Sequence, residues 1–71
     1  MNAGQIARFH FAAAMAQAAA EGQDADAVGR TLLAEVVKSM LLRRSMADVR
    51  AEILAMADNI DPDTDYMFMR P

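Results

Sequence analysis

Apolar residues near the start of the chain recur at helical spacing. Five of them follow one another by three or four positions, which places them on one face of a helix: Ile6, Phe9, Ala13, Ala16 and Ala20. Gly22 comes next, and glycine is the residue type that most often ends a helix. The pattern predicts a helix over residues 3–21, whose alanines would let another helix approach closely.

A second helical pattern covers residues 24–43. Asp24 is the expected N-cap, and Asp26 would place negative charge in the first turn, where the helix dipole favours it. Seven apolar side chains of this segment span an arc of about 220° at 100° per residue: Val28, Leu32, Leu33, Val36, Val37, Met40 and Leu41. An ordinary surface helix has an apolar stripe nearer about 100° wide, so this helix is expected to be covered on two sides.

A third helix is predicted over residues 46–59. Ser45, with Asp48 three residues later, resembles a capping box. The apolar residues alternate spacings of three and four, as in the seam of a helical bundle: Met46, Val49, Ile53, Met56 and Ile60. The four residues 61–64 read as a type I turn with Pro62 at its second position, and residues 60–71 are expected to form a short extended tail.

These patterns predict an all-α fold in a single helical domain, residues 1–71. The three helices would form a small bundle, or a helical hairpin plus a third helix. A chain of 71 residues without cysteine has a small core and no disulfide to brace it. Self-association is therefore expected, as a dimer with an interface on the second helix: Leu33, Val37, Met40 and Leu41.

The residues suited to catalysis or metal binding are few. The single histidine, His10, lies between two phenylalanines on the alanine-rich first helix, and the absence of cysteine argues against a zinc site within one chain. Asp61, Asp63 and Asp65 resemble the start of a calcium loop, but the sixth position holds Tyr66, where the loop needs glycine. We therefore expect no enzyme activity, no metal and no cofactor.

Basic residues gather around the second interhelical turn: Lys38, Arg43, Arg44 and Arg50. Residues 36–54 could form a helix-turn-helix with its recognition helix in the major groove of DNA. The turn has no glycine and the net charge is −3, whereas DNA-binding domains usually carry a basic footprint. Nucleic acid is therefore not the expected partner. No uncharged run approaches the length of about 20 residues that spans a membrane, and a cytoplasmic protein is expected.

The C-terminal tail is the least ordinary feature of the sequence. Residues 1–57 hold six acidic and six basic residues, so the whole net charge lies in residues 58–71. The residues expected to bind a partner are three aspartates and an unbroken apolar run: Asp61, Asp63, Asp65, Tyr66, Met67, Phe68 and Met69. Two aromatic anchors with a polar rim are typical of an interface. The run could pack on this chain's own helices or on another chain.

The sequence as a whole therefore predicts a non-enzymatic protein-interaction module, such as a small regulator, adaptor, inhibitor or accessory subunit. It would bind a protein partner through helix faces and the tail. Two alternatives come from other classes of function. One is a DNA-binding regulator that uses the helix-turn-helix. The other is an acidic inhibitor whose aspartates occupy a basic nucleic-acid-binding groove of a target protein.

Overall fold

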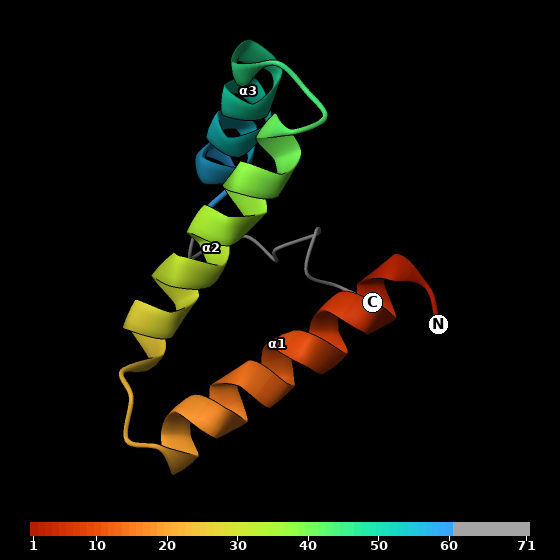
Figure 1. Cartoon of the computed structure of the whole chain (residues 1–71). Helices are drawn as coiled ribbons and strands as arrows, with labels where there is room; N and C mark the ends of the chain where they lie inside the picture. The colour runs from red at the N-terminus through yellow and green to blue at the C-terminus, as the bar shows by residue number, and fades with distance from the viewer. Residues whose placement is uncertain (61–71) are drawn as a thin grey trace. The chain divides into compact units, whose positions relative to one another are not determined.

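The described part of the chain is entirely helical between its turns. The computed structural model describes residues 1–60, in which three α-helices follow one another: α1 (Ala3–Ala20), α2 (Ala25–Leu41) and α3 (Met46–Asp58) (Figure 1). Each helix begins and ends within two residues of the predicted bounds, which confirms the all-α fold class. The predicted turn at residues 61–64 and the tail beyond it lie outside the described residues.

Helix α1 is closed at both ends by local hydrogen bonds. At its start, the Asn2 side chain accepts a hydrogen bond from the Gln5 amide at 2.8 Å, and the Gln5 side chain accepts one from the Asn2 amide at 2.9 Å. At its end, Gly22 takes a left-handed φ of 69° and the Gln23 amide donates to the Ala18 carbonyl at 2.8 Å. This Schellman motif confirms the helix end predicted at Gly22.

The caps predicted for the other two helices are also formed. Asp24 Oδ2 accepts a hydrogen bond from the Ala27 amide at 2.9 Å, at the start of α2. Ser45 Oγ accepts one from the Asp48 amide at 3.2 Å, at the start of α3, which is the N-cap half of the capping box that Ser45 and Asp48 resembled. Each bond satisfies a backbone donor that the first turn of a helix leaves without a partner. The positions at which these helices begin are therefore specified locally.

Two glycines, one at the end of α1 and one inside α2, are expected to respond in opposite ways to replacement by alanine. Gly22→Ala should destabilise the protein by about 1 kcal/mol, because a Cβ disfavours the left-handed conformation. Gly29→Ala should stabilise it by about 0.5–1 kcal/mol, because Gly29 lies inside α2 and a Cβ there meets no atom within 4 Å. Urea unfolding followed by circular dichroism measures both changes, and two shifts of the same sign would contradict this reading.

The chain divides into two compact units, the first of which is residues 1–36. Unit 1 contains α1 and the beginning of α2. Its one buried residue among those described is Ala18, which is 5% exposed, and Ala14, Met15 and Val28 around it are half-buried. The core of unit 1 thus combines two small side chains of α1, Ala14 and Ala18, with Met15 of α1 and Val28 of α2.

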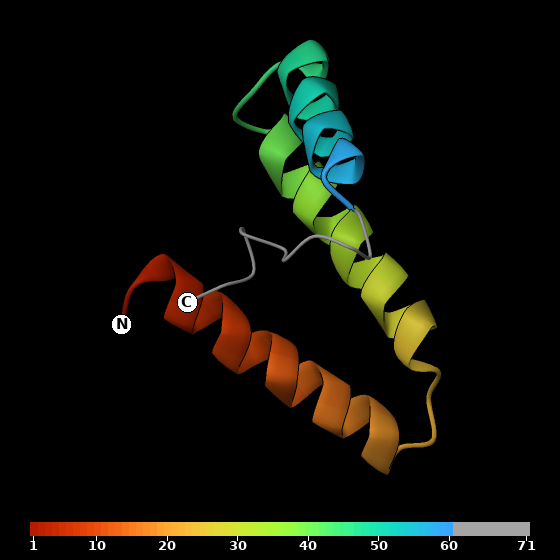
Figure 2. The same cartoon turned by 180° about the vertical axis from the view of Figure 1, so that it is seen from behind.

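Unit 2 begins at Val37. Its described part is a helical hairpin, in which the last turns of α2 lead through residues 42–45 into α3, which returns alongside them (Figures 1 and 2). The buried residue of this described part is Val49, which is 2% exposed. The single helical domain expected over residues 1–71 stays a prediction.

Candidate functional site

A continuous apolar stripe of α1 is exposed. We call it the α1 stripe, and its five members are all exposed in the structure: Ile6, Phe9, Ala13, Ala16 and Ala20. Phe9 is 61% exposed and Ile6 is 47% exposed. These are the residues whose spacing predicted the first helix. They form an apolar surface that no described part of unit 1 covers.

The packed side of α1 faces away from the α1 stripe. Ala14, Met15 and Ala18 are the least exposed side chains in the second half of α1, and Ala14 and Ala18 line a pocket together with Val28 of α2. At 100° per residue, the middle of this set lies about 170° around the helix from the middle of the α1 stripe. Helix α1 therefore has two apolar sides, and unit 1 uses one of them.

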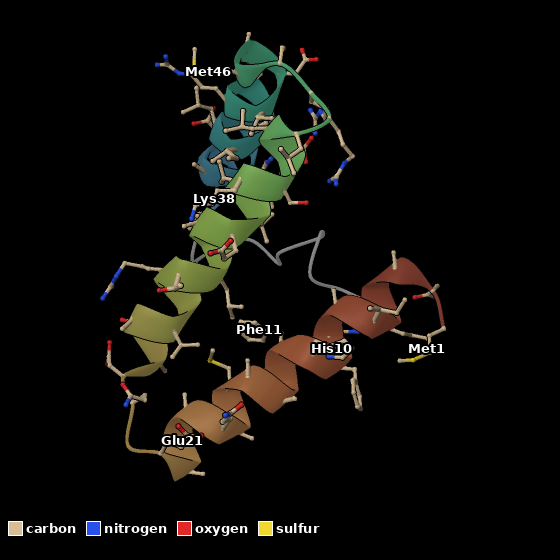
Figure 3. All side chains as sticks on the ribbon, in the orientation of Figure 1. Met1, His10, Phe11, Glu21, Lys38 and Met46 are labelled. Carbon is tan, nitrogen blue, oxygen red and sulfur yellow. The ribbon has the colours of Figure 1, made fainter. Side chains whose placement is uncertain are left out.

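His10 lies beside the α1 stripe and has an aromatic neighbour. Its ring meets the ring of Phe9 edge to face, with 5.0 Å between the ring centroids and 89° between the planes. His10 and Phe11 are both exposed and leave α1 in different directions (Figure 3). Within residues 1–60, no three histidine, cysteine, aspartate or glutamate side chains come together as a metal site would require. The His10 contact therefore adds aromatic surface near Phe9.

Unit 2 has an apolar groove between the end of α2 and α3. Its volume is about 260 Å³, and we call it the unit 2 groove. Arg50 is the single charged residue along it, beside six apolar ones: Val37, Leu41, Met46, Val49, Ile53 and Leu54. The Met46 side chain projects from the first turn of α3 (Figure 3). The groove is open to solvent.

The four residues predicted to mediate self-association differ in their surroundings. Leu33 and Leu41 are exposed, whereas Val37 and Met40 are half-buried. Val37 and Leu41 both line the unit 2 groove, so they already contribute to the hairpin with α3. No residue of α2 is buried. Self-association through this set stays a prediction. All five members of the α1 stripe are exposed, whereas two of these four residues are, so the α1 stripe is the more exposed surface of the two, although its spacing alone did not point to self-association.

The basic cluster is partly engaged in local contacts. Arg44 Nη1 donates a hydrogen bond to Glu52 Oε1 at 2.6 Å, which ties the interhelical turn to α3. Arg43 Nη1 donates one to Ser39 Oγ at 3.1 Å, which links the interhelical turn to the last turn of α2. Such contacts divert two guanidinium groups from the phosphates that a DNA-binding helix-turn-helix would engage. They favour a structural role for Arg43 and Arg44.

The predicted tail residues lie outside the described residues, from Asp61 to Met69. In the described part of the chain, no helix combines the length and the apolar character needed to cross a membrane. Comparison with protein-family models, with curated proteins and with solved structures finds no match for this chain. We therefore infer its function from the surfaces of the chain itself.

Proposed function

We propose that the chain is a non-enzymatic protein-interaction module that binds through its exposed helix faces and its C-terminal tail. Its first partner is a second copy of itself, held through the α1 stripe. The observation that supports this most is the exposure of Ile6 and Phe9 on the side of α1 that faces away from its packed side. A cytoplasmic location belongs to the proposal, because a chain without cysteine has no disulfide to lose in a reducing compartment.

The order of side-chain sizes along the α1 stripe favours an antiparallel pair. The two large residues, Ile6 and Phe9, precede three alanines. When two copies run in opposite directions and overlap along most of the helix, Ile6 lies level with Ala16 of the second copy, and Phe9 with Ala13. Each large side chain then lies opposite a small one, and this pairing lets the interface pack closely without voids or clashes. A parallel pair would set Phe9 against Phe9 and leave the alanines apart.

The small residues also set how close the two helices come. Alanine at three of five stripe positions allows the backbones to approach at the short end of the usual range of about 8–10 Å between helix axes. A close approach lets Phe9 contact the backbone of the second copy as well as its side chains. Transfer of a phenylalanine or isoleucine from water to full burial contributes about 1.5–3 kcal/mol. Because the pair is symmetric, these residues contribute twice.

Single cysteines test this arrangement cleanly, because the chain has none of its own. In the antiparallel pair, the two residues 13 lie on the facing stripes about 6 Å apart along the axis, whereas the two residues 16 are about 15 Å apart. Ala13→Cys should therefore be joined into a dimer by a short bismaleimide crosslinker, and Ala16→Cys should react far less. Equal crosslinking of the two variants would indicate a parallel pair. Crosslinking of neither variant would contradict the proposed interface.

A further inference from the structure

The unit 2 groove is large enough for an aromatic ring and part of a second side chain. Its volume is about 260 Å³, and an apolar cavity of about 150 Å³ is enough to bind benzene. Its walls are aliphatic and thioether side chains, with Val49 at the base as the buried residue of the hairpin. The groove therefore suits one aromatic side chain together with part of a second apolar one.

The chain supplies such side chains just beyond α3. Ile60 is the last described residue, and Tyr66–Met69 follows within ten positions. Five residues separate Ile60 from Tyr66, so an extended chain can place Tyr66 as far as about 20 Å from Ile60. Met46, at the far end of the groove, lies fourteen residues back along the chain, which is about 21 Å of helix. A chain that reverses direction after Ile60 can therefore reach the whole length of the groove.

Charge also favours this occupant. Residues 61–71 contain three aspartates and one arginine. Arg50 is the one charged residue that lines the groove, and it makes no ion pair or hydrogen bond through its side chain within residues 1–60. An aspartate that flanks the apolar run would complement Arg50 at the groove edge.

We propose that Tyr66–Met69 of the same chain occupies the unit 2 groove, with Tyr66 and Phe68 facing α2 and α3, and an aspartate of the tail beside Arg50. In an extended segment alternate side chains face opposite ways, so Met67 and Met69 then face outward, where a partner protein can contact them. The same chain is the occupant because a short tether gives the tail an effective concentration of about millimolar at its own groove. This inference concerns unit 2 alone and does not depend on the dimer proposed at α1.

Tyr66 provides a specific probe, because the chain has one tyrosine and no tryptophan. In the full chain, acrylamide should quench Tyr66 fluorescence several-fold less efficiently than it quenches a free tyrosine amide. Leu54→Asp should restore efficient quenching, because Leu54 lines the groove yet is 51% exposed, so the hairpin tolerates the change. Leu42→Asp is the matched control, since Leu42 is 87% exposed and lies outside the groove, and it should leave quenching unchanged.

A second pair of variants tests the same site through charge, in case Leu54→Asp reduces helicity. Arg50→Glu should increase quenching of Tyr66, whereas Arg43→Glu, outside the groove lining, should not. Quenching as efficient as for the free amide in the unmodified chain would overturn the proposal. Quenching that responds to neither Leu54→Asp nor Arg50→Glu would also overturn it. If protection of Tyr66 disappears on dilution together with a dimer, the tail occupies the groove of a second copy and the assignment to the same chain is wrong.

Discussion

Replacing Ala13 by glutamate is expected to convert the proposed dimer into a monomer. Ala13 lies at the middle of the α1 stripe and is exposed, so in a single chain the substitution has little effect on folding. In the dimer it places a carboxylate against Phe9 of the second copy and near the second introduced carboxylate. Like charges brought together at an interface cost several kcal/mol. The dissociation constant should therefore rise at least about 100-fold, since each 1.4 kcal/mol is a factor of ten.

Ala7→Glu is the matched control for this variant. Ala7 is also exposed on α1, and at 100° per residue it lies about 140° around the helix from the middle of the α1 stripe. Sedimentation equilibrium of the two variants at equal concentration should find a monomer for Ala13→Glu and the wild-type assembly for Ala7→Glu. If both variants assemble as the wild type does, the interface lies elsewhere, and the predicted set on α2, which includes Leu33, becomes the next surface to test.

Replacing Val49 by aspartate is expected to unfold unit 2. Val49 is 2% exposed and lies on α3, where it lines the unit 2 groove between α2 and α3. A carboxylate at this position would be buried without a partner, which costs about 3 kcal/mol or more. That is a large share of the stability of so small a domain. The helicity of α3 and of the end of α2 should therefore decrease, and the remaining helix should melt with little cooperativity.

Val36→Asp makes the same chemical change at a residue that is 53% exposed. Valine and aspartate have similar helix propensities, so this control should retain most of the wild-type helicity. Circular dichroism of both variants across a urea titration compares them directly. Equal helicity for the two variants would show that Val49 is not the centre of the hairpin core.

Much of the fold follows from local signals in the sequence. Asp24, Ser45 and Gly22 marked helix boundaries that the structure reproduces, because each acts through a hydrogen bond or a backbone conformation within a few residues. The capping box between Asn2 and Gln5 was missed. Its signal was present, since asparagine is a favoured N-cap and glutamine three residues later is the usual partner.

The packing of α1 was the part that periodicity could not decide. Spacing identifies the face formed by Ile6, Phe9 and the alanines, but it does not say whether that face meets the same chain or another. The structure packs the opposite side, around Ala18, which reads in the sequence as one more alanine in a run of them. A side chain so small gives a weak hydrophobic signal, although it allows the closest helix contact.

The proposed tail site shows a similar limit. The apolar run Tyr66–Met69 is visible in the sequence, and so is the acidic charge around it. The groove that could receive it depends on Val37 and Leu41 of α2 facing Ile53 and Leu54 of α3. That arrangement arises from the hairpin, and spacing within one helix does not reveal which side chains of the next helix complete a groove.

Molar mass measured by light scattering on the unmodified chain tests the central claim most directly. One chain has a mass of 7.7 kDa. We expect the measured mass to rise towards twice this value as the protein concentration increases through the micromolar range, while Ala13→Glu stays at the mass of one chain throughout. A mass of 7.7 kDa for the unmodified chain at every concentration would contradict self-association through the α1 stripe.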